Sequence, residues 1–154
     1  MELESKLLIA TISASSAISG AVISQAFSII RDILDKKHQR KVLLRTKYEE
    51  FAELITRSHE WLSALYRHKS IEEHSNNPPN HARKALLLAY IYFPALIKQS
   101  EKFMNSCVII QSSMIENFQT KDIEPLKEPV KEFKENRQEL DRLIILNAKK
   151  YSKA

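Results

Sequence analysis

Glycine is almost absent from this chain, since Gly20 is the one glycine among its 154 residues. Tight turns with a positive φ angle depend on glycine, so helices are expected rather than β-sheets. A glycine-rich phosphate-binding loop is excluded for the same reason. Cysteine is equally rare, because Cys107 stands alone. An intramolecular disulfide is therefore excluded, and the composition indicates an all-α protein.

Prolines and other turn residues are concentrated in two stretches, residues 75–80 and 122–129. They divide the chain into three helical segments. After a long apolar opening, we expect helices at about 44–70, 80–118 and 128–150, joined by short loops into an up-down-up three-helix bundle. Pro94 lies inside the second helix and should bend it, because it removes a backbone donor.

Each of the three segments has apolar residues at alternating steps of four and three, the spacing of a coiled-coil-like seam. Cys107 lies on the second seam, which predicts a buried, inert thiol. The seam positions are Leu44, Tyr48, Phe51, Ile55, Ser58, Leu62 and Leu65; then Ala82, Leu86, Ala89, Phe93, Leu96, Ser100, Phe103, Cys107, Ile110 and Met114; then Val130, Phe133, Arg137, Leu140 and Ile144.

Charge is missing from residues 7–30, a run of 24 residues between Lys6 and Arg31. A helix of this length covers about 36 Å, which is enough to cross a hydrocarbon core of about 30 Å. The sequence therefore predicts one transmembrane helix at 7–30. Two other interpretations stay open: a core helix of a soluble bundle, and a cleaved signal.

The charges on either side of this run are unequal. Only Lys6 precedes it among the basic residues, whereas seven lysines and arginines follow between Arg31 and Lys47. Basic residues near a span are retained on the cytoplasmic side. We therefore expect a single-pass cell-membrane protein with residues 1–6 outside, a basic juxtamembrane neck at 31–43 and a cytoplasmic bundle at 44–154.

Small residues of the predicted span share one helical face. A stripe of this kind lets two helices approach closely and form hydrogen bonds across the interface, which predicts a homo-oligomer. A serine-lined pore formed by several copies, and a stripe without function, are the alternatives. The residues of this face are Ser13, Ser16, Ala17, Gly20, Ser24 and Ser28.

The neck carries a polybasic cluster of Lys36, Lys37, Arg40 and Lys41. Such a cluster is attracted to anionic lipid headgroups, although it would also serve simply as a topology signal. Nucleic-acid binding is not expected, because acidic residues follow directly at Glu49 and Glu50.

Aromatic residues gather around the predicted junction of the first two bundle helices. They form either part of the core or a groove that receives a helix or peptide of a partner protein. The candidate groove residues are Trp61, Tyr90, Tyr92, Phe93 and Pro94.

No residues carry a recognisable catalytic, metal or cofactor motif. The five histidines lack the spacing of a helical zinc site, and the carboxylates alternate with lysines as on an ordinary solvated helix. We therefore expect a non-enzymatic membrane-anchored protein that acts by oligomerisation and partner binding, without a cofactor. The alternatives are a pore-forming effector of the toxin or abortive-infection type, and a soluble bundle with 7–30 as its core helix.

Overall fold

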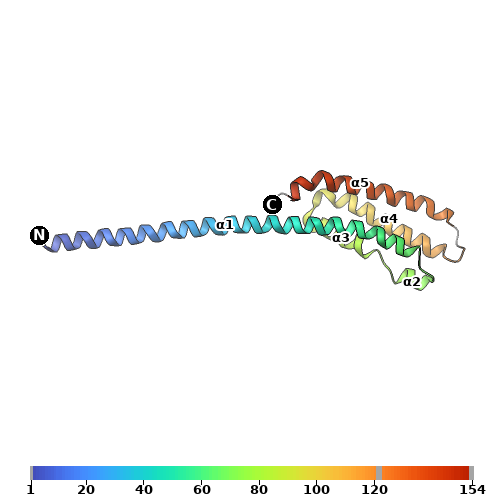
Figure 1. The fold of residues 1–154 in the computed structure, drawn as a ribbon, viewed down its shortest axis with the longest axis horizontal. Coiled ribbons are helices and arrows are strands. Elements are labelled where there is room, and N and C mark those ends of the chain that lie inside the picture. The colour runs from blue at the N-terminus through green and yellow to red at the C-terminus, as the bar shows by residue number, and fades with distance from the viewer. Residues whose placement is uncertain (1, 121–122, 153–154) are drawn as a thin grey trace. The chain divides into compact units, whose positions relative to one another are not determined.

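Most of the part that the structure describes is helical, and no strand occurs there (Figure 1). The computed structural model describes the backbone of residues 2–120 and 123–152, and the side chains of residues 16, 19–120 and 123–151. The all-α class is therefore confirmed. The elements are α1 (Glu2–Leu65), α2 (Ile71–Ser75), α3 (Asn80–Tyr92), the 3-10 turn η1 (Pro94–Leu96), α4 (Ile97–Glu116), the 3-10 turn η2 (Glu124–Leu126) and α5 (Lys127–Ser152).

The chain divides into two compact units, Met1–Lys41 and Val42–Ala154. The first unit consists of the N-terminal part of α1. This helix continues without interruption to Leu65, so its C-terminal part supplies the first helix of the second unit.

The second unit is an antiparallel four-helix bundle, and contacts identify its two ends. At one end the ring of Phe93 lies 5.2 Å from that of Tyr48 and 5.0 Å from that of Tyr151. At the other end Trp61 donates its indole N–H to the carbonyl of Asn77 at 2.9 Å. Within this unit α1 and α4 therefore run in one direction, and α3 and α5 run in the other (Figure 1).

The expected three-helix, up-down-up bundle is wrong, because the segment 80–118 forms two helices instead of one. Helix α3 ends at Tyr92, and Phe93 leaves the helical region with φ −129° and ψ 67°. Pro94 cannot donate a backbone hydrogen bond, so it opens the new turn η1 instead of continuing α3. The chain reverses there, and Tyr90 donates its hydroxyl proton to Glu101 at 2.6 Å across the hairpin. The topology is up-down-up-down.

The seam residues form the core of the bundle, as the sequence predicts. The most deeply buried large side chains include Phe51, Phe93, Phe103 and Phe133, each less than 2% exposed. The Tyr48 hydroxyl donates a hydrogen bond to the carbonyl of Ile144, which ties α1 to α5. The seam positions that are only partly buried are Leu44, Leu86, Val130, Arg137 and Ile144.

Replacing Phe93 by alanine should lower the free energy of unfolding by about 3–5 kcal/mol, the usual cost of removing a fully buried phenylalanine. The reason is that this ring also packs on Phe51 of α1, at 5.7 Å between centroids. Urea unfolding followed by the fluorescence of Trp61 measures the change. Leu87→Ala, at a position of α3 that is 54% exposed, is the control and should cost far less. Equal losses for the two variants would contradict the proposed core.

Candidate functional site

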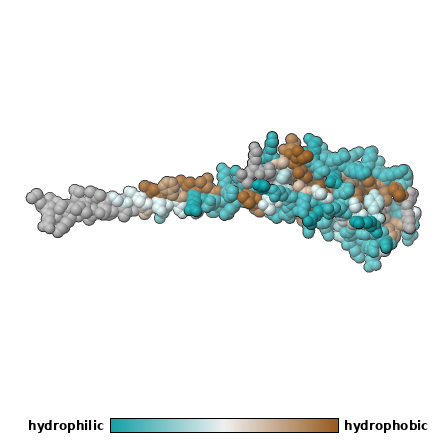
Figure 2. All heavy atoms as spheres, in the orientation of Figure 1, coloured by the Kyte–Doolittle hydropathy of each residue, from teal (hydrophilic) through white to brown (hydrophobic). Residues whose placement is uncertain are grey.

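The described part of α1 ahead of the bundle carries a continuous apolar face. At 100° per residue its members lie within an arc of about 160°, which is the pattern of an amphipathic helix. Figure 2 shows hydrophobic side chains gathered along one side of this stretch. All of them are exposed, from Ile30 at 54% to Phe27 at 69% among the large ones. This apolar face of α1 consists of Val22, Ile23, Ala26, Phe27, Ile29, Ile30, Ile33 and Leu34.

The predicted small-residue face lies beside this apolar face and meets its edge at Ser16, so that the centres of the two faces are about 120° apart. Ser16, Gly20, Ser24 and Ser28 are exposed, whereas the side chains of Ser13 and Ala17 lie outside the described residues. A Cβ atom added at Gly20 would meet no atom within 4 Å, apart from the backbone of its own turn and its chain neighbours. Nothing in the single chain therefore requires glycine at this position, and a close approach there would need a second helix.

No helix is both long enough and apolar enough to cross a membrane within the part of the chain that is described. The predicted span 7–30 falls partly outside that part, because the side chains of residues 7–15, 17 and 18 are not described. The transmembrane helix therefore stays a prediction.

The polybasic cluster is exposed on α1, and all four of its members, Lys36, Lys37, Arg40 and Lys41, are open to solvent. Among the described residues, no carboxylate lies within 4.0 Å of any of these four cations. Ion pairs resume only where the bundle begins, with Arg45 to Glu49 at 3.0 Å and Lys47 to Glu50 at 2.6 Å. The cluster is therefore available for an external anion, whereas Arg45 and Lys47, the next two basic residues, are already paired.

The structure does not bring the candidate aromatic groove together. Trp61 is 5% exposed and donates a hydrogen bond to Asn77 at the end of the bundle that includes α2, which we call the loop end. Phe93 is fully buried beside Tyr48 at the opposite end. Trp61 and Tyr48 are separated along α1 by about 20 Å, at 1.5 Å per residue. Tyr90 is 51% exposed and Pro94 is also exposed, and Tyr92 is partly buried. These side chains do not share one groove.

The burial of His74 could not be predicted from the apolar pattern of the sequence. His74 belongs to none of the predicted seams, yet its side chain is only 4% exposed. Ser70 caps α2 by accepting a hydrogen bond from the backbone N–H of Glu73 at 3.1 Å, and the short helix turns His74 inward. The Ser-x-x-Glu spacing at 70–73 is a helix-start signal that could have located this turn.

The described residues contain no group of three or more histidine, cysteine, aspartate or glutamate side chains that could hold a metal ion. No family model matches the chain, and neither a curated protein nor a solved structure matches it.

Cys107 should react with a thiol reagent only after the bundle unfolds. Its side chain is fully buried, and this burial raises the pKa of the thiol to about 12 from an ordinary value of 9.0. A shift of this size lowers the thiolate fraction at pH 8 by about a thousandfold relative to the unfolded chain. Maleimide labelling with and without urea measures the difference. Rapid labelling of the native chain would contradict the buried position.

Proposed function

We propose that this chain is a non-enzymatic, membrane-anchored helical protein. Residues 7–30 of α1 would span the membrane with the N-terminus outside, and residues 44–154 would form a bundle at its cytoplasmic face. The protein would act by association between copies and by binding a partner protein.

The observation that carries this proposal is the exposed apolar face of α1. It includes seven large apolar side chains, which are 54–69% exposed. Covering a side chain of this kind contributes about 1–2 kcal/mol, so covering all seven would contribute about 10 kcal/mol per copy. The core of the bundle extends only from Tyr48 to Tyr151 among the described residues, and it includes no member of this face. Lipid or a second helix would bury this apolar face.

The orientation is supported by the polybasic cluster. Four exposed cations without carboxylate partners lie between residues 36 and 41, on the side of the uncharged run that would remain in the cytoplasm. Near anionic headgroups, each such charge contributes about 1 kcal/mol of attraction. The cluster would therefore both set the topology and hold this part of α1 at the membrane surface.

Association between copies is supported by the small-residue face. In a membrane the apolar face up to Ile30 would point to lipid, and Gly20 and Ser24, which lie beyond the edge of that face, would allow close packing of two helices. The space around Gly20 in the single chain is consistent with such an arrangement.

Partner binding is supported by apolar residues on the outside of the bundle. Ile145 and Leu146 of α5 are 75% and 68% exposed, and Lys149 and Lys150 follow them within one turn. An apolar pair next to two cations suits an acidic amphipathic helix of a partner.

A pore-forming effector is the second candidate. Ser16, Ser24 and Ser28 expose hydroxyl groups on one face, and several such helices could line a polar channel. A pore would collapse the membrane potential when the protein is expressed, whereas an anchor would leave it intact. A potential-sensitive dye distinguishes the two.

The wild-type chain should remain with membranes during extraction at alkaline pH, because the apolar face would be buried in lipid. Replacing both Val22 and Ile23 by lysine should release it, since each charge near the bilayer centre costs about 2.5–3.5 kcal/mol. Replacing Ile145 and Leu146 by lysine adds the same charge to the bundle and is the matched control, which should stay bound. Release of the wild-type chain into the supernatant would reject the anchor.

Disulfide cross-linking in membranes should depend on which face of α1 carries the new cysteine. Ser24→Cys should give linked dimers under mild oxidation, because two cysteines facing each other at an interface come within about 7 Å between Cα atoms. Val22→Cys lies about 160° away on the helix and should give none. The buried Cys107 adds no background. Efficient linkage at Val22 and none at Ser24 would show that the apolar face, not the small-residue face, joins the copies.

A further inference from the structure

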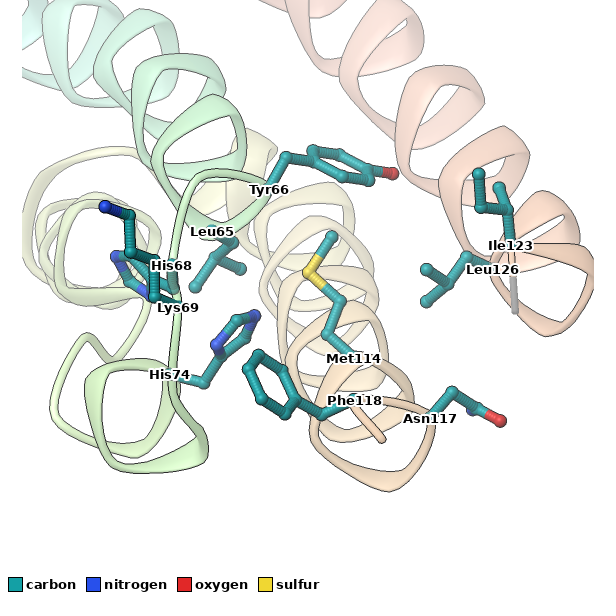
Figure 3. A pocket seen from close by; sticks show the side chains of 10 residues that line it. All are labelled: Leu65, Tyr66, His68, Lys69, His74, Met114, Asn117, Phe118, Ile123 and Leu126. Atoms are coloured by element: carbon teal, nitrogen blue, oxygen red, sulfur yellow. The ribbon is translucent and has the colours of Figure 1, made fainter. Parts of the chain in front are cut away.

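A cavity of about 430 Å³ opens at the loop end of the bundle, where the C-terminal end of α1, α2, the end of α4 and η2 meet (Figure 3). Its size lies within the range of small-molecule sites. The lining residues are Leu65, Tyr66, His68, Lys69, His74, Met114, Asn117, Phe118, Ile123 and Leu126.

The walls of the cavity are mostly apolar. Leu65 is fully buried, and Met114 and Leu126 are 5% and 8% exposed, so these three side chains belong to the core and are held in place by it. Phe118 and Ile123 complete the apolar lining. A hydrocarbon group entering this space would bury apolar surface on several sides without disturbing the core.

His74 supplies a polar group inside this apolar space. Its Nδ1 lies 3.1 Å from the carbonyl oxygen of Ser70, so Nδ1 carries a proton and donates it there. The ring is fixed by edge-to-face packing on Phe118 at 5.1 Å and on His68 at 4.9 Å between centroids. Its Nε2 has no hydrogen-bond partner among the described residues.

A second unpartnered nitrogen lies next to it. The Nδ1 of His68 is buried and has no hydrogen-bond partner among the described residues. The other ring nitrogen of His68, Nε2, lies 3.5 Å from the side-chain amide nitrogen of Asn77, so neither nitrogen of this ring is open to a ligand. The nitrogen left for a ligand is Nε2 of His74, and one polar group in an apolar cavity indicates a ligand with a single polar end.

The residues that line the cavity indicate that the polar end of the ligand is negatively charged. They include Lys69 and two histidines, and none of the ten is acidic. Figure 3 shows the Lys69 side chain beside His68 at the edge of the cavity. The Glu73 carboxylate on α2 does not line the cavity, and it accepts a hydrogen bond from the backbone N–H of Lys69 at 2.7 Å.

We propose that this cavity binds a small apolar monocarboxylate, such as a medium-chain fatty acid. The carboxyl group would form a hydrogen bond with Nε2 of His74, and the hydrocarbon chain would lie against Leu65, Met114 and Leu126. The proposal concerns the bundle alone, and it does not depend on whether α1 enters a membrane.

The chain contains its own reporters for this site. Met114 lines the cavity, whereas Met104 is 9% exposed, lies ten residues earlier on α4 and is not part of the lining. Labelling the methionine methyl groups with ¹³C therefore provides a signal at the site and an internal control in the same spectrum.

The test is a titration of the labelled full-length chain with octanoate, in lipid nanodiscs. The Met114 methyl signal should shift and saturate, while the Met104 signal stays in place. His74→Gln should weaken binding about tenfold, as the loss of one charge-assisted hydrogen bond implies. His59→Gln, at an exposed position of α1, is the matched control and should bind like the wild type.

Three results would overturn the proposal. One is an affinity for octanol equal to that for octanoate, which would mean that the carboxylate is not recognised. Another is parallel, unsaturated shifts of Met104 and Met114, which would indicate nonspecific partition. The third is unchanged binding in Ile123→Phe, which enlarges a lining side chain that is 67% exposed and should block the cavity without disturbing the core. This last variant also serves if His74→Gln does not fold.

Discussion

The apolar face of α1 is costly to expose to water, and the proposed function depends on this constraint. Between Val22 and Leu34 the helix presents large apolar side chains on one side, and more than half of the surface of each is exposed. Soluble monomeric proteins rarely leave a continuous apolar stripe of this length open to water. Lipid or another helix would remove the cost, and the membrane anchor and the association of copies both follow from that need.

The bundle differs from this stretch of α1, because its helices bury their seam residues in a common core. Phe93 shows how: its ring contacts α1 through Tyr48 and Phe51 and contacts α5 through Tyr151. Phe93 stands directly before Pro94, so the break in the helix and the aromatic cluster at this end of the core occur at the same place in the chain. Phe93, the residue directly after α3, thus also joins α3 to α1 and α5.

Much of this fold could be predicted from the sequence, because heptad spacing reports burial directly. Tyr48, Phe103 and Leu140 are buried as their spacing requires. The number of helices could not be predicted, since a proline at position 94 is compatible with either a bend or a reversal. Which of the two occurs depends on whether the segments on both sides find packing partners, and this is a non-local property. The burial of His74 was missed for the same reason, because residues far away in the chain enclose it.

The functional roles of the candidate site residues stay predictions. The uncharged run and the polybasic cluster are local patterns, and the exposure of their described side chains is consistent with a surface role. The candidate groove residues do not lie together, because nearness in the predicted helices does not fix their positions in the fold. Trp61 and Phe93 lie at opposite ends of the bundle.

The most direct measurement of the central claim is the accessibility of a spin label at Ile23→Cys in vesicles. The account predicts that the label is relaxed by oxygen dissolved in the lipid and is shielded from an aqueous nickel complex. Ready access of the nickel complex to the label would contradict it.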